Sequence, residues 1–191
     1  MISKPIVALA GITLAVVLLA SAARGTSARW QDIEDLHSGD LHSGELSLLN
    51  GDASSQTADY AFTELSGAGL GPGSWSQAPL TIRNGGSAGL DYRLLSTSAP
   101  DGTGLATAFQ LRLSAVSSAD SCPVGVGASA PTGPVQTLYD GLLLGASSAA
   151  RPLAVGAAES LCVRVAVSSS AASSSQGAAT AITFTFGAVS T

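Results

Sequence analysis

The residues best suited to chemistry in this chain are two histidines in a repeated pentad. Residues 36–40 read Leu-His-Ser-Gly-Asp and residues 41–45 read Leu-His-Ser-Gly-Glu. The imidazoles of His37 and His42 and the carboxylates of Asp40 and Glu45 are nitrogen and oxygen ligands that zinc or copper accepts. However, the sequence contains no HExxH motif, and paired histidines in a polar, glycine-containing stretch are usually solvated. We therefore expect no metal and no other cofactor, and these four residues are only weak metal candidates.

A second motif, at residues 85–89, matches the GxSxG pattern of serine hydrolases. That nucleophile elbow needs a strand before it, a helix after it and a histidine base further along the chain. No histidine follows His42, and Asn84-Gly85-Gly86 is typical of a hairpin turn between two strands. The acidic residues are scattered singly, so no carboxylate pair for glycoside hydrolysis is evident. We expect no catalytic residues and no enzymatic activity.

Two cysteines, Cys122 and Cys162, are present. In an oxidising compartment an isolated pair usually forms a disulfide. Chain-entropy estimates give a bridge across a loop of this length about 3–4 kcal/mol. The alternative is two buried free thiols.

The compartment follows from the N-terminus. A short positive region containing Lys4 precedes an apolar run at residues 6–20 and small residues at 21–28, the layout of a secretory signal peptide over residues 1–28. Cleavage fits after Ala22 or between Ala28 and Arg29, and the second is preferred. The alternative is a membrane anchor, because a spanning helix needs about 20 apolar residues. We expect a secreted, extracellular or cell-surface protein that meets signal peptidase during export and touches a membrane only through the uncleaved signal.

Removal of the signal leaves residues 29–191, the length of a single domain. This part keeps six of the eight basic residues and all thirteen acidic ones, a net charge of −7 with no lysine. No basic patch remains to attract nucleic acid or anionic lipid. Without a lysine amine, any assembly is expected to be non-covalent.

Alternation of apolar and polar residues predicts an all-β fold for residues 45–191. It is clearest at residues 109–113, 161–168 and 182–186, with weaker strands at 45–49, 59–65, 78–83, 90–96 and 135–144. Only residues 104–109 suggest a turn of helix. Gly, Pro, Asn and Asp clusters between the strands are typical of turns. We expect an antiparallel β-sandwich, with residues 117–134 and 168–177 as flexible surface loops.

Between signal and sandwich lies a charged segment, residues 29–44, with four apolar residues. They are Trp30, Ile33, Leu36 and Leu41. A chain terminus is free to move unless something ties it down, so this segment is a candidate donor strand for the open sheet edge of a neighbouring subunit. The alternative is that it packs on its own domain.

Several motifs together resemble one protein family. Gly25-Thr26-Ser27-Ala28, followed by Trp30 and an acidic residue, is similar to signals processed by the SipW-type signal peptidase, which favours cleavage after Ala28. Residues 43–48, 70–73 with 80–86, and 175–177 with 182–186 resemble, in order, the first strand, a central segment and the closing strand of the TasA and camelysin (CalY) family. The resemblance covers nearly the whole chain. It implies a jelly-roll sandwich and, as for TasA, secreted subunits that polymerise into biofilm-matrix fibres by strand donation.

Three functions follow as hypotheses. The first is a structural protein that forms a homopolymer, or co-assembles with related secreted subunits, by donor-strand exchange. The second is a monomeric secreted binding module or adhesin that uses its serine-rich loops. The third, a metal-dependent peptidase, is the activity with which camelysin-type proteins have been labelled, and it would need His37 and His42 to hold metal.

Overall fold

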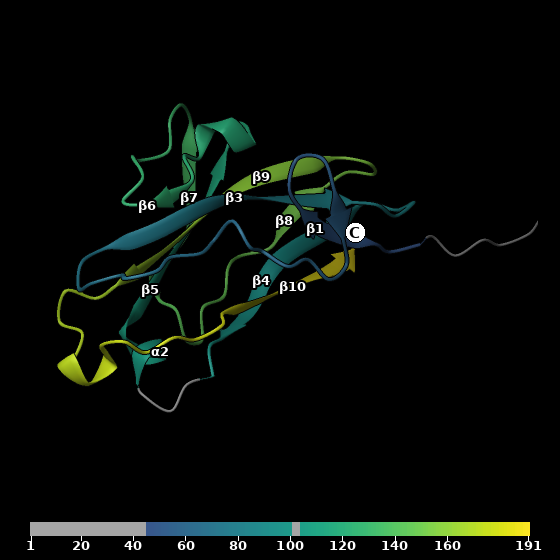
Figure 1. Ribbon diagram of the computed structural model, residues 1–191. Coiled ribbons are helices and arrows are strands. Elements are labelled where there is room, and N and C mark those ends of the chain that lie inside the picture. Colours follow the sequence, from purple (N-terminus) through teal and green to yellow (C-terminus); the bar gives the residue numbers. More distant parts are fainter. Residues whose placement is uncertain (1–44, 101–103) are drawn as a thin grey trace, which may run out of the picture. The chain divides into compact units, whose positions relative to one another are not determined.

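The structure is a computed structural model that describes residues 45–100 and 104–191, all within one compact unit (Figure 1). The strands are β1 Leu48–Gly51, β2 Gln56–Thr57, β3 Trp75–Asn84, β4 Leu90–Ser98, β5 Phe109–Val116, β6 Gly125–Val126, β7 Val135–Leu142, β8 Arg151–Leu153, β9 Ala158–Val167 and β10 Thr183–Ser190. The helical turns are α2 Leu105–Ala108, η2 Ala119–Ser121 and η3 Ser173–Ser175. Predictions for the signal peptide and residues 29–44 lie outside the described residues.

The strands form two sheets, and every pairing between them is antiparallel. The larger sheet has the order β2-β1-β3-β9-β5-β7, with β6 also paired to β3, and the smaller has the order β10-β4-β8. This confirms the predicted all-β, two-sheet sandwich. Among the described residues, the edge strands of the smaller sheet are β10 and β8.

The core lies between the sheets because the central strands alternate as the sequence predicted. In β9, Leu161, Val163 and Val165 are buried in the main core cluster. Cys162 and Arg164 alternate with them and belong to the opposite face of the sheet. Pro79 in β3 has no N–H to donate, and it lies between the stretch paired with β6 and the stretch paired with β1. The sheet therefore tolerates a proline where one edge of β3 has no neighbour.

Most predicted strands are confirmed, with ends shifted by a few residues, and the predicted helical turn is α2. The strand predicted at residues 59–65 is wrong, since this segment has no strand pairing. Tyr60 and Phe62 in this segment still pack against the core. The alternating pattern therefore reflects partial burial of these side chains and not strand pairing. Residues 117–134, predicted as a flexible loop, contain the short elements η2 and β6.

The hairpin predicted at the GxSxG motif is also wrong. The loop after Asn84 connects β3 of the larger sheet to β4 of the smaller sheet, so the two strands do not pair. The buried Asn84 side chain donates from Nδ2 to the carbonyls of Ala88 and Leu153, and its Oδ1 accepts from Gly86 N–H. The Asn84 side chain therefore stabilises a connection that passes from the larger sheet to the smaller one, and not a two-residue hairpin turn. The motif is followed by a strand and not by the helix that a nucleophile elbow requires.

A polar cluster joins the two sheets beside the core. The Tyr92 hydroxyl in β4 donates to Glu159 in β9, and Arg151 in β8 donates to both carboxylate oxygens of Glu159. Arg151 Nη1 also donates to Gln136 Oε1 in β7 at 3.0 Å. The Arg151 and Glu159 side chains are only 23% and 20% exposed, so the pair is shielded from water. The Glu159 carboxylate therefore links the two sheets of the sandwich.

Stability is expected to fall in acid because of Glu159. Burial by itself raises the pKa of Glu159, but hydrogen bonds from Arg151 and Tyr92 and the Arg151 charge outweigh it and hold the pKa below its ordinary value of 4.5. A carboxyl with a lowered folded-state pKa stabilises the fold above its unfolded pKa and loses that stabilisation as the pH falls through the folded value. The free energy of unfolding, measured with urea between pH 7 and pH 3, should be constant at the higher pH values and should decrease toward pH 3. In the variant Glu159→Gln the decline should be smaller, and an equal decline would contradict the assignment.

Candidate functional site

β10 forms one edge of the smaller sheet. β10 pairs with β4 on one side over its full length, from Thr183 opposite Ser98 to Ser190 opposite Leu90. Among the described residues, no strand pairs with its other side. An unpaired row of backbone N–H and C=O groups is a template for another strand. β10 is therefore a candidate acceptor edge.

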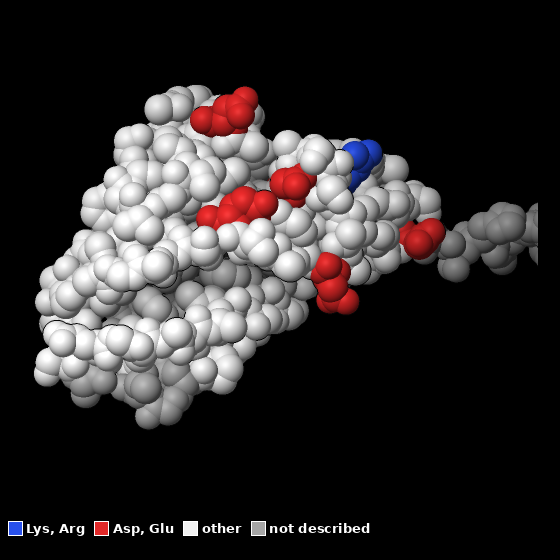
Figure 2. All heavy atoms as spheres, in the orientation of Figure 1, with Lys and Arg blue, Asp and Glu red and all other residues white. Residues whose placement is uncertain are grey.

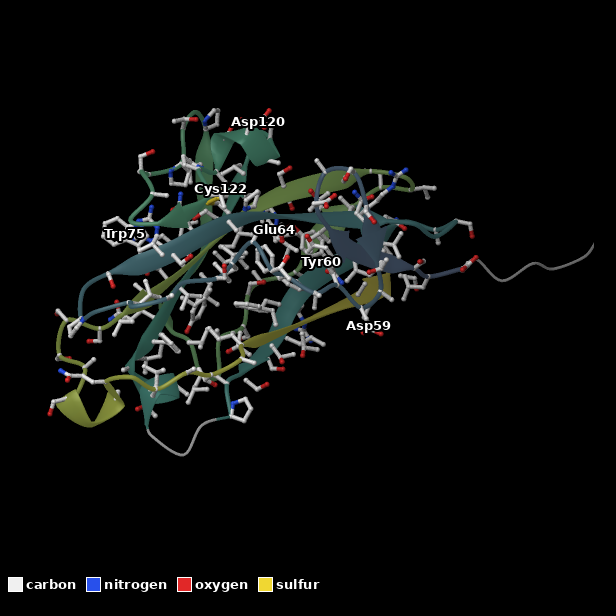
Figure 3. The ribbon with its side chains drawn as sticks, viewed as in Figure 1. Asp59, Tyr60, Glu64, Trp75, Asp120 and Cys122 are labelled. Atoms are coloured by element: carbon white, nitrogen blue, oxygen red, sulfur yellow. A yellow bond between two sulfur atoms is a disulfide. The ribbon has the colours of Figure 1, made fainter. Side chains whose placement is uncertain are left out.

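A hollow of about 500 Å³ lies beside this edge. Its lining comes from β10, from β1 and from the irregular segment 58–62, and it includes the side chains of Tyr60, Phe62, Phe184 and Phe186. Asp59 and Tyr60, both labelled in Figure 3, share this lining with residues from the first half of β10. No backbone hydrogen bond joins segment 58–65 to β10 in the described part of the chain. The two backbones are thus neighbours through side chains alone.

Aromatic rings connect the segment to the edge strand. The Phe62 ring meets the Phe184 ring edge-on, with centroids 6.5 Å apart, and Tyr60 lies 6.1 Å from Phe62. Edge-to-face pairs contribute about 0.5–1.5 kcal/mol beyond area burial. Burial, followed by a 3.0 Å hydrogen bond to Glu64, raises the pKa of the Tyr60 phenol to about 12. Tyr60 therefore stays neutral at physiological pH.

Asn50, which also lines this hollow, has an unpartnered oxygen. Its Nδ2 donates weakly to the Ala58 carbonyl at 3.4 Å, but its buried Oδ1 accepts no hydrogen bond from the described residues. Leaving a buried acceptor unpaired costs about 1–3 kcal/mol. An incoming donor, such as a backbone N–H, would remove that cost.

The β1–β2 hairpin holds Asn50 in place. Asp52 Oδ1 accepts from Ser54 N–H at 2.6 Å and from Ser55 N–H at 2.7 Å, an Asx-turn arrangement. The chain passes so close at Gly51 that a Cβ there would lie 1.9 Å from the Ser55 carbonyl oxygen. Only glycine fits this position, so the hairpin that carries Asn50 has a fixed shape.

The predicted site residues divide between described and undescribed parts of the chain. The metal candidates His37, Asp40 and His42, the cleavage-site residues Ala28 and Arg29, and the self-assembly residues Trp30, Ile33, Leu36 and Leu41 lie outside the described residues. Glu45 is described, is exposed, and donates its backbone N–H to Ser87 Oγ at 2.8 Å. Within residues 45–100 and 104–191, no group of three His, Cys, Asp or Glu side chains is placed to hold a metal.

The predicted disulfide is present in the structure. It joins Cys122 to Cys162, with Cα atoms 5.4 Å apart, and both residues pack with Val116 in a small cluster apart from the main core. Cys122 lies on the side of β3 that faces away from β4 and β10 (Figure 3). The bond therefore fastens loop 117–134 to the outer face of the larger sheet.

The sequence does not indicate the open β10 edge, nor the hollow beside it that Tyr60, Phe62 and Asn50 line. The alternation at 59–65 predicts a strand, whereas the structure gives this segment no strand pairing. The described residues also contain no helix with the length and apolar character needed to cross a membrane. No protein-family model matches the chain, and no curated protein is significantly similar to it.

Proposed function

We propose that this chain is a secreted, non-enzymatic structural protein whose subunits assemble non-covalently, each donating residues 29–44 to the β10 edge of the next. The TasA and camelysin resemblance implies this mode of assembly, and the jelly-roll topology belongs to the same proposal. The partner is a second copy of the chain or a related secreted subunit. The Cys122–Cys162 disulfide is compatible with an oxidising compartment outside the cytoplasm.

The observation that carries the proposal is the combination of a free edge and an apolar hollow beside it. An added strand gains backbone hydrogen bonds from the edge and specificity from pockets for its side chains. β10 offers eight residues of edge, and the hollow offers aromatic walls and the unpartnered Asn50 oxygen. The apolar residues of segment 29–44, led by Trp30 and Ile33, supply side chains for such a hollow.

Charge on the surface favours ordered contacts over non-specific clustering. Figure 2 shows acidic side chains spaced singly on one face of the molecule, with no extended patch of basic ones. A net negative charge keeps protein subunits soluble and separate unless a specific contact overcomes the repulsion. Strand addition, which pairs several backbone groups at once, is a contact of that kind.

Deletion of residues 29–44 is expected to abolish self-association. The chain from Arg29 to Thr191 should form filaments visible by electron microscopy, and oligomers in light scattering. The chain that begins at Glu45 should be monomeric, because it keeps the acceptor edge and lacks the donor.

A length-matched control separates the donor's side chains from the length of the segment. In this variant Trp30, Ile33, Leu36 and Leu41 are replaced by serine, and it should also be monomeric. A synthetic peptide of residues 29–44 should bind the shortened chain and block assembly of the longer one. Filaments formed by the shortened chain, or a strictly monomeric longer chain at high concentration, would overturn the proposal.

A second candidate function is a monomeric binding module. Its support is a hollow of about 760 Å³ at the other end of the sandwich, between residues 67–72 and the serine- and alanine-rich loop 171–180, with Phe109 and Val167 in its wall. A hollow of this size suits a small ligand or a peptide. Under this function, deletion of residues 29–44 leaves the oligomeric state unchanged.

A further inference from the structure

A polar row crosses the outer face of the larger sheet, away from β10. Four residues are direct cross-strand neighbours in register on β3, β9, β5 and β7: Gln77, Arg164, Arg112 and Asp140. The two arginines therefore lie side by side in the middle of the row. Like charges directly opposite each other on paired strands are destabilising, so this juxtaposition needs an explanation.

Each arginine has a hydrogen-bond partner on its outer side. Arg164 Nε donates to Gln77 Oε1 at 2.8 Å, and the Arg164 guanidinium carbon lies 5.1 Å from the centre of the Trp75 ring. Arg112 donates to Asp140 Oδ2 from Nε at 3.0 Å and from Nη2 at 2.6 Å. Within the described chain, no acceptor is hydrogen-bonded to the Nη atoms of Arg164 or to Nη1 of Arg112. The remaining donors of both guanidinium groups are available to a ligand.

The disulfide-linked loop makes the Arg164 half of this row rigid. Gln77 is fully buried, and its Nε2 donates to the carbonyls of Pro123 at 2.7 Å and Ser129 at 2.9 Å. Trp75 Nε1 donates to the Ala128 carbonyl at 3.1 Å. Loop 117–134 therefore fixes Gln77 and Trp75, the two side chains that contact Arg164. Binding by prearranged groups costs less conformational entropy than binding by free side chains.

Two shallow hollows flank the arginine pair. One, of about 240 Å³, includes Thr137 and Ser114, and the other, of about 170 Å³, includes Trp75, Gln110 and Asp140. Both have Arg112 and Arg164 in their walls. Burial, and after it the neighbouring charge of Arg112, lowers the pKa of Arg164 below its ordinary value. An anion between the two groups would relieve that repulsion.

We propose that this row is a binding site for the carboxylate of an acidic saccharide, such as a uronic acid unit. A guanidinium group matches the planar carboxylate with two parallel N–H···O bonds. Polar groups flank the arginine pair: the Thr137 hydroxyl, the Gln110 amide and the Asp140 carboxylate. They can form hydrogen bonds with the hydroxyl groups of a sugar, which an apolar ligand does not have. The Arg112–Asp140 pair is about half exposed, with side chains 52% and 51% accessible. Such a pair contributes at most about 1 kcal/mol, so Arg112 can turn toward a ligand.

The site is tested by calorimetric titration of the purified chain with trigalacturonic acid. The trimer should bind, and its methyl ester, which has no charged carboxylate, should not. Hydrogen bonds to charged groups are strong enough that Arg164→Gln should weaken binding about tenfold or more. Arg112→Gln, which removes an exposed side chain and leaves the fold intact, should weaken binding about threefold or more by the same reasoning.

The matched control is Arg93→Gln, which removes the same charge from an exposed position on β4 of the smaller sheet. This variant should bind the trimer as tightly as the unchanged protein. If it weakens binding as much as the Arg164 and Arg112 variants do, the effect comes from net charge alone and the site is overturned. Absence of trimer binding would also overturn it. If tetraglutamate binds as tightly as the trimer, the saccharide assignment is wrong. Oligomeric state, measured separately by light scattering, reports on strand exchange and is independent of these outcomes.

Discussion

Replacement of Cys122 and Cys162 by alanine is expected to lower the free energy of unfolding by about 3–4 kcal/mol. The bond closes a loop with a sequence separation of 40 residues, and opening it restores entropy to the unfolded chain. Both side chains are 2% exposed, so alanine leaves no polar group without a partner. Urea unfolding of the oxidised chain and of the double variant gives the difference directly.

The reduced, unsubstituted chain is the control for this measurement. It loses the bond but keeps the sulfur atoms that pack against Val116, so any further loss in the alanine variant measures packing. The Gln77 and Trp75 contacts to loop 117–134 remain possible in both chains, since they are hydrogen bonds to backbone carbonyls. A difference below about 0.5 kcal/mol, the scatter typical of neutral surface changes, would contradict the loop-entropy account.

Glu159→Ala is expected to destabilise the fold by about 3 kcal/mol, the lower end of the range for breaking a buried ion pair, because the Arg151–Glu159 pair is partly exposed. The variant leaves Arg151 without its carboxylate and the hydroxyl of Tyr92, a residue 1% exposed, without an acceptor. Because Tyr92 and Arg151 belong to the smaller sheet and Glu159 to the larger, the variant also removes a link between layers. Thermal and urea unfolding measure the loss.

Glu64→Ala is the matched control, because Glu64 also accepts a hydrogen bond from a tyrosine hydroxyl, that of Tyr60 at 3.0 Å. Glu64 is exposed, and water can replace it at the phenol. Its removal should change stability by less than about 0.5 kcal/mol. Equal effects of the two variants would show that the Glu159 cluster does not link the sheets.

The fold class could be predicted from the sequence because the period-two pattern is strongest where strands are central. In β9 and β5, one face packs in the core and the other faces the loop or solvent, so each residue type reports its side of the sheet. The disulfide was also predictable, since there are two cysteines and one possible pairing. Strand ends and the pairing order were not, because they depend on contacts between residues far apart in the chain.

The GxSxG segment illustrates how such contacts override local preference. Asn-Gly-Gly favours a tight hairpin, but Asn84 is fully buried and bonded to the Leu153 carbonyl at 3.1 Å, across 69 residues. The apolar residues Tyr60 and Phe62 lie two positions apart, as side chains on one face of a strand do. Their neighbour β10 is more than a hundred residues further along the chain, and it pairs with β4 and not with this segment. The open β10 edge and the arginine row both arise from such long-range register, which composition does not encode.

The position of the disulfide also has a consequence for proteolysis. The bond links residue 122 to residue 162, so it spans β6, β7, β8 and the start of β9. A protease that nicks the exposed backbone between these two cysteines produces fragments that stay covalently attached. Neither fragment diffuses away, and the sheet keeps its strands at high local concentration for re-pairing.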